Sequence, residues 1–171
     1  MAMKKKYIIK ILLFTPPIII FFIMLIHQLT MPRRDSNTLF EIVIWPSGGG
    51  RSGTEIYYLI VSNDGVFRSY IGRSRSSCGS YRTHRFLRSV QQSAEVTLSE
   101  EEFLRVSELV EQIITTEDDY LWPVAWTNSY IIFLYNGKIY ENCAAWIAPL
   151  DDLVHALNAL TPLPFWDHRN R

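Results

Sequence analysis

The chain has 171 residues, and its 17 basic and 17 acidic side chains give a formal net charge of zero. The acidic residues all lie at or after Asp35, whereas six of the basic residues lie at or before Arg34. The part that begins at Asp35 therefore carries a net charge of about −6. This charge argues against general nucleic-acid binding, which needs a basic surface.

The first element along the chain is a predicted transmembrane anchor over residues 7–29. Its apolar run is just long enough, because about 20 apolar residues of helix cross the roughly 30 Å of bilayer hydrocarbon. Pro16 and Pro17 interrupt the run and predict a kink, since each removes a backbone donor. Four lysines, including Lys10, precede the apolar run that starts at Ile11, and two arginines follow it, which favours a cytoplasmic flank over residues 1–6 and an extracytoplasmic domain.

A cleaved secretory signal is the alternative for the same segment, with the lysines as its basic region. The residues that follow, HQLTMPRRD, contain no small-x-small cleavage pattern and no cysteine that could accept a lipid. We therefore expect an uncleaved signal-anchor, and cleavage would instead remove about three kilodaltons.

The rest of the chain is long enough for one domain. A tether over residues 30–38 precedes a predicted globular domain over 39–165, and residues 166–171 form a tail. About 130 residues suffice for one hydrophobic core and leave little room for a second domain.

Three strands are predicted at the start of this domain. Residues 39–45, 55–62 and 66–71 are rich in β-branched and aromatic side chains. The last two flank Asn63-Asp64-Gly65, which suits a tight hairpin turn. Residues 85–90 are expected to form a further extended segment.

Two helices are predicted. The first spans residues 100–115, because Ser99 and Glu102 have the spacing of a capping box and apolar residues then recur every three or four positions. The second starts near Pro149, has a stripe of leucine and valine, and ends before Pro162.

A second hairpin is predicted between the helices. Asn136-Gly137 favours a two-residue turn that joins residues 129–135 to 138–144. This turn predicts the pairs Tyr135–Lys138, Phe133–Tyr140 and Ile131–Asn142. The opposite face then holds Ile132, Leu134, Ile139 and Cys143, which we expect to be the core side. The order of elements predicts an α+β fold, a small antiparallel sheet with two helices on one face.

No motif predicts a cofactor. Gly48, Gly50 and Gly53 match G-x-G-x-x-G, but a strand rather than a helix follows them, so we expect no nucleotide. The histidines lack a metal-ligand spacing, and we expect no metal. Asp151 and His155 lie four residues apart on a predicted helix, which suits a surface pair better than a catalytic one.

An arginine-rich stretch is the one candidate for ligand binding. Between residues 72 and 92 the chain has no acidic residue. Guanidinium groups suit phosphate or carboxylate ligands, such as lipid head groups or an anionic polymer. The candidate residues are Arg73, Arg75, Arg82, Arg85 and Arg88. The alternative is that the acidic residues of 95–119 neutralise them within the fold.

Two cysteines, Cys78 and Cys143, are either a disulfide in an oxidising compartment or two separate thiols.

Together, the features of the whole sequence predict a non-enzymatic, single-pass membrane protein whose domain binds a ligand or protein partner at the membrane surface. One alternative is a membrane-tethered hydrolase that uses Asp151 and His155. Another is a structural subunit of a larger membrane complex.

Overall fold

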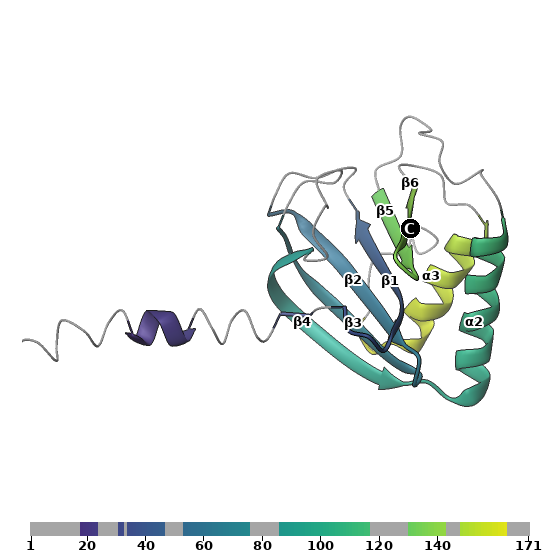
Figure 1. Cartoon of the computed structure of the whole chain (residues 1–171), viewed down its shortest axis with the longest axis horizontal. Helices are drawn as coiled ribbons and strands as arrows, with labels where there is room; N and C mark the ends of the chain where they lie inside the picture. The colour runs from purple at the N-terminus through teal and green to yellow at the C-terminus, as the bar shows by residue number, and fades with distance from the viewer. Residues whose placement is uncertain are drawn as a thin grey trace, which may run out of the picture. The chain divides into compact units, whose positions relative to one another are not determined.

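The computed structural model describes residues 18–23, 31–32, 34–46, 53–75, 86–116, 130–142 and 148–163 (Figure 1). The chain divides into two compact units, residues 1–32 and 33–171. In the first unit, residues 18–23 form a short helix of isoleucine and phenylalanine whose side chains are all more than half exposed. Among the described residues, no helix has the length and apolar character needed to cross a bilayer. Most of the segment 7–29 lies outside the described residues, so the anchor stays a prediction.

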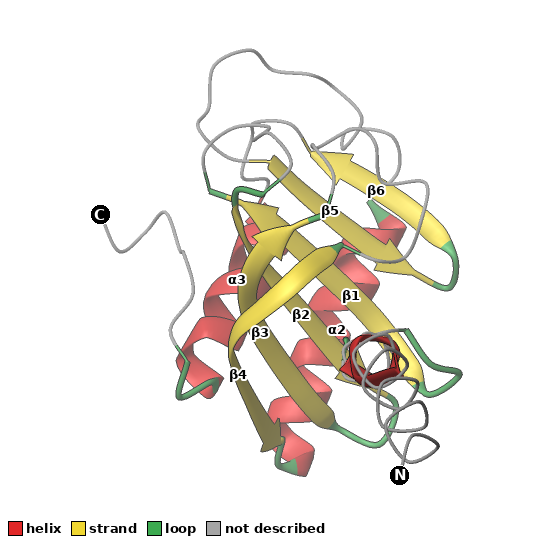
Figure 2. Cartoon of the chain, turned by 90° about the vertical axis from the view of Figure 1, so that its left-hand side faces the viewer, coloured by secondary structure: helices red, strands yellow, loops and turns green. Residues whose placement is uncertain are grey.

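The second unit is an α+β domain, as predicted. Its six strands form one antiparallel sheet in the order β4-β3-β2-β1-β5-β6. Both helices of the unit cover the same face of that sheet (Figures 1 and 2). In chain order the elements are β1 (Thr38–Trp45), β2 (Glu55–Ser62), β3 (Val66–Ser74), β4 (Leu87–Thr97), α2 (Glu100–Thr115), β5 (Tyr130–Tyr135), β6 (Lys138–Asn142) and α3 (Ala148–Leu160).

The predicted meander is confirmed, but β4 is longer than expected. It runs for 11 residues instead of the six predicted over 85–90. Two register shifts interrupt its pairing with β3, next to Gly72 and Ser74. A Cβ atom on Gly72 would lie 2.1 Å from the carbonyl oxygen of Ser89, so only glycine fits at the first shift. These bulges disturb the alternation of polar and apolar residues, which explains why the strand signal of this segment is weak.

The hairpin of β5 and β6 has the predicted pairs, and Asn136 and Gly137 have the positive φ angles that the turn requires. The predicted core side was wrong. Phe133 and its same-face neighbours, not Ile132, pack in the core beneath the helices, and Ile139 is 38% exposed. Cys143 lies outside the described residues. The error arose because β5 is an inner strand buried on both faces, so its apolar run does not indicate which face meets the helices.

Helix α2 begins and ends at the predicted residues. The Ser99 side chain accepts a hydrogen bond from the Glu102 amide, and the Glu102 carboxylate accepts one from the Ser99 amide. This capping box satisfies two backbone donors at the start of the helix. The buried face of α2 contributes Val106, Val110 and Ile113 to the core.

The inner strands β1, β2 and β5 are buried on both of their faces. The main core lies between the sheet and the helices, and includes Ile42, Phe133, Val110 and Leu153. The opposite face, which we call the second side, carries the alternate residues of the same strands. Ile139 on the border strand β6 is 38% exposed, but seven large residues on this side have an exposed fraction of at most 5%: Val43, Trp45, Tyr58, Phe86, Tyr130, Ile132 and Leu134.

Candidate functional site

Three of the predicted arginines lie at one end of the β3–β4 pair. Arg73 is the penultimate residue of β3, opposite Ser89, and Arg88 is the second residue of β4. Arg75 follows β3, and its amide donates to the carbonyl of Phe86 at 2.7 Å. All three side chains are exposed. We call Arg73, Arg75 and Arg88 the arginine end.

The backbone at the arginine end is fixed by hydrogen bonds. The Gly53 amide lies 2.9 Å from the carbonyl oxygen of Ser74 and 3.0 Å from its hydroxyl oxygen. The Ser74 amide donates to the Thr54 carbonyl at 2.7 Å, and an Arg73 guanidinium nitrogen donates to the Gly53 carbonyl at 3.4 Å. The arginines therefore extend from ordered strand ends. A guanidinium held in this way suits bidentate contact with a carboxylate or phosphate.

The charges of the arginine-rich and acidic segments are largely separated along the sheet. Arg68 and Glu95 form an ion pair between the two segments, at 2.7 Å. This hydrogen bond to Glu95 raises the pKa of Arg68. Arg73 and Arg88, by contrast, form no ion pair with any residue that the structure describes. The glutamates at the start of α2 follow the opposite end of β4, and strands of this length span roughly 25 Å.

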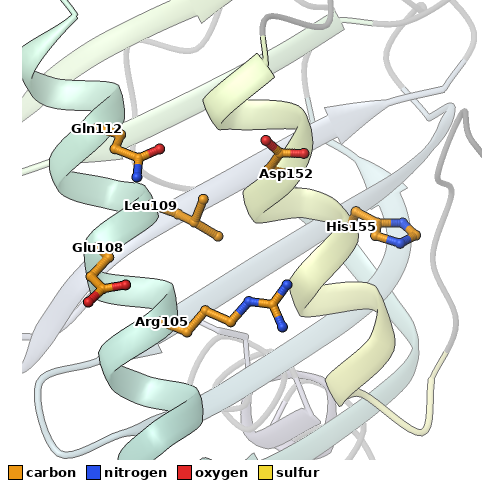
Figure 3. A pocket seen from close by; sticks show the side chains of 6 residues that line it. All are labelled: Arg105, Glu108, Leu109, Gln112, Asp152 and His155. Atoms are coloured by element: carbon orange, nitrogen blue, oxygen red, sulfur yellow. The ribbon is translucent and has the colours of Figure 1, made fainter.

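A groove lies between α2 and α3 (Figure 3). It has a volume of about 410 Å³ and is lined by Arg105, Glu108, Leu109, Gln112, Asp152 and His155. Figure 3 shows Arg105 extended from α2 toward α3, whereas the His155 ring points away from α2. The hydrolase alternative needs Asp151 and His155 in one cleft. Here the neighbouring Asp152 lines the groove, while Asp151 is buried with 8% exposure.

Among the described residues, no group of histidine, cysteine and acidic side chains could hold a metal ion. The groove offers an exposed imidazole, the two exposed carboxylates of Glu108 and Asp152, and one guanidinium over a small apolar floor. Such a surface suits weak polar contacts. Acid–base chemistry would need groups held in fixed geometry around a bound substrate.

A buried polar cluster on the second side was not predicted. The carboxylate of Glu41 is fully buried in β1 and accepts a hydrogen bond from the Tyr58 hydroxyl. The Arg34 guanidinium lies 3.7 Å from its other oxygen. Burial raises the pKa of Tyr58 well above its ordinary value, and the neighbouring Glu41 charge adds to this effect. A signal was present in the sequence, because Glu41 is the only charged residue in an otherwise apolar inner strand.

Other predicted site residues lie outside the described residues. They are Arg82, Arg85, Cys78 and Cys143, so the full arginine set and the disulfide remain predictions.

No protein-family model matches the sequence, and the comparison with curated proteins found no match. We therefore base the function on the chemistry of the chain's own residues.

Proposed function

We propose that the protein is a non-enzymatic, single-pass membrane protein whose domain binds an anionic ligand through the arginine end. The observation that carries this proposal is the pair Arg73 and Arg88, which are exposed on ordered strands and form no ion pair within the described residues, although Glu55 lies opposite Arg73 on β2. The ligand groups that match guanidinium best are phosphate and carboxylate, which accept two parallel hydrogen bonds from it.

The apolar helix of residues 18–23 supports the membrane part of the proposal. The exposed fractions of its six isoleucine and phenylalanine side chains run from 52% to 63%. Apolar surface of this kind gains roughly 25 cal/mol for each Å² that leaves water, so a lipid environment favours it. With the lysines of the N-terminal flank on the cytoplasmic side, residues 7–29 would anchor the chain and place the domain on the other side.

A binding measurement on the full-length protein in nanodiscs of neutral lipid tests the arginine end. One arm titrates soluble polyphosphate, and a second arm adds vesicles that contain phosphatidylglycerol. We expect binding at low salt that weakens as salt is added. The double variant Arg73→Gln/Arg88→Gln should weaken it by about tenfold or more, since each lost charge-assisted hydrogen bond costs about 1.5–3 kcal/mol.

The matched control is Arg105→Gln, which removes an exposed arginine from α2 and leaves the arginine end intact. We expect its affinity to stay within about twofold of the original chain. The two arms separate a ligand in solution from a lipid head group. Absence of binding to both probes at low salt, or equal loss in the control, would overturn the proposal.

The anchor is tested separately by the size and extraction of the membrane-bound protein. An uncleaved span should resist alkaline carbonate and keep its full mass of 19.9 kDa. Release by carbonate, together with a loss of about three kilodaltons, would identify a cleaved signal instead.

A further inference from the structure

Residues 34–38, which the sequence predicts as part of a tether, are bonded to the domain. The Asn37 amide and the Thr38 hydroxyl both donate to the Asp35 carboxylate, at 2.9 and 3.0 Å. The Asn37 carbonyl accepts two further bonds from Asn63 in the β2–β3 turn, one from its amide at 2.8 Å and one from its side chain at 2.9 Å. The segment thus closes on itself and on the neighbouring hairpin.

Arg34 supplies a second attachment, on the second side of the sheet. Its guanidinium lies 3.7 Å from the Glu41 carboxylate, and its side chain is 28% exposed, against 1% for Glu41. A buried carboxylate is costly unless a cation and hydrogen-bond donors compensate it. The Tyr58 hydroxyl donates one bond, and Arg34 provides the charge. Undocking of Arg34 would therefore leave a buried charge without this cation.

We infer that Arg34, Glu41 and Tyr58 form a latch that docks residues 34–38 onto the domain and shortens its link to the membrane anchor. The inference rests on the proposed function only for the existence of that anchor. With the latch closed, five residue steps separate Leu29 from Arg34 and span at most about 17 Å. With the latch open, nine steps separate Leu29 from Thr38 and span up to about 31 Å.

The latch sets how far the domain can move from the bilayer surface. Opening it nearly doubles the reach of the link, so the domain and its arginine end sample a larger volume. A partner that binds Arg34, or a change that removes the Glu41 charge, would act on this distance. The exposed pair Arg68–Glu95 has no such effect, because both of its residues lie within the sheet.

Hydrogen–deuterium exchange on the full-length protein in neutral nanodiscs tests the latch. The reporter amides are those of Asn37, Thr38 and Asn63, which are hydrogen-bonded in the docked state. Arg34→Gln should speed their exchange by about tenfold or more, because docking loses its charge pair. The buried amides of α2 report global unfolding, and their exchange should change much less.

Two further variants make the result decisive. Glu41→Gln removes the buried charge from the other partner and should also speed exchange at the same three amides. Glu95→Gln removes an exposed acid from an ion pair elsewhere and should leave them unchanged. If Arg34→Gln leaves the three amides as protected as in the original chain, or if it speeds α2 equally, the latch is excluded.

A distance measurement tests the consequence for the membrane. A fluorescent amino acid replaces the exposed Glu101 near the start of α2, and an acceptor dye is attached to the lipid head groups. Arg34→Gln should lower the energy transfer, because the longer link lets the domain move farther from the lipid head groups. Glu95→Gln should leave the transfer unchanged. Equal transfer in the two variants would contradict the shorter link. The reporter amides lie in the domain itself, so their exchange can also be measured on a cleaved chain. Cleavage would therefore refute the anchor and leave the latch to be decided by exchange.

Discussion

The two faces of the sheet are both buried along the inner strands β1, β2 and β5 but differ in chemistry. The helix side packs aliphatic residues and Phe133 against α2 and α3. The second side places the Glu41 carboxylate, the Tyr58 hydroxyl and the Trp45 indole nitrogen among apolar groups. The Trp45 nitrogen has no hydrogen-bond partner among the described residues. The helix side is therefore a hydrophobic core of the usual kind, whereas the buried carboxylate on the second side also contacts Arg34 in the preceding segment.

The largest expected effect comes from the helix side. Phe133 is fully buried and packs against Phe40 and Tyr140, with ring centroids 5.8 and 5.7 Å away. Phe133→Ala should lower the free energy of unfolding by about 3–5 kcal/mol, because it leaves a cavity as well as losing buried apolar surface. Chemical denaturation measures this. A loss below about 1 kcal/mol would contradict the assignment of the main core to this side.

A smaller loss is expected on the second side. Tyr58→Phe keeps the ring and removes only the hydroxyl that donates to Glu41. It should lower the free energy of unfolding by about 1–3 kcal/mol, since the buried carboxylate loses a donor. The same denaturation curves provide the measurement. An unchanged midpoint would mean that water or another group replaces the hydroxyl at no cost.

The second side should also make stability sensitive to alkaline pH. An unfolded tyrosine ionises near its ordinary pKa of 10.0, whereas burial raises the pKa of Tyr58 in the folded chain. The stabilising effect is therefore complete below pH 10 and is lost as the pH rises from there toward the folded pKa. Tyr58→Phe should reduce this slope. Some slope should remain, because burial also raises the pKa of Tyr57 and Tyr70.

The smallest effect is expected at the surface. The side chains of Arg68 and Glu95 are 32% and 62% exposed, although they lie only 2.7 Å apart. Glu95→Gln should change the free energy of unfolding by no more than about 0.5 kcal/mol, and added salt should reduce even that difference. A larger loss would show that this exposed pair contributes to stability as a buried one does.

Local signals in the sequence predicted the elements of the domain well. The capping box at Ser99 and the turn at Asn136-Gly137 act over a few residues, so the fold class, α2 and the hairpin register could be derived from them. Which face of β5 meets the helices depends on contacts between distant segments. The apolar run of an inner strand does not encode that choice.

The candidate site was predicted less well, for a similar reason. The arginines were found by composition, but their separation from the acidic helix depends on the sheet topology. Glu41 was overlooked because a charged residue inside an apolar strand is ordinarily placed on a solvated face. Its buried carboxylate is compensated by Arg34, which lies 7 residues before it, and by Tyr58, which lies 17 residues after it. Both contacts form only when the chain folds.

The bulges of β4 have a consequence for contacts between copies of the chain. A flat, exposed strand at the border of a sheet can pair with the same strand of a neighbouring copy. The two register shifts near Gly72 and Ser74 twist this border of the sheet. The other border strand, β6, has only five residues and begins with Lys138. Both borders are thus poor templates for edge-to-edge pairing of two copies.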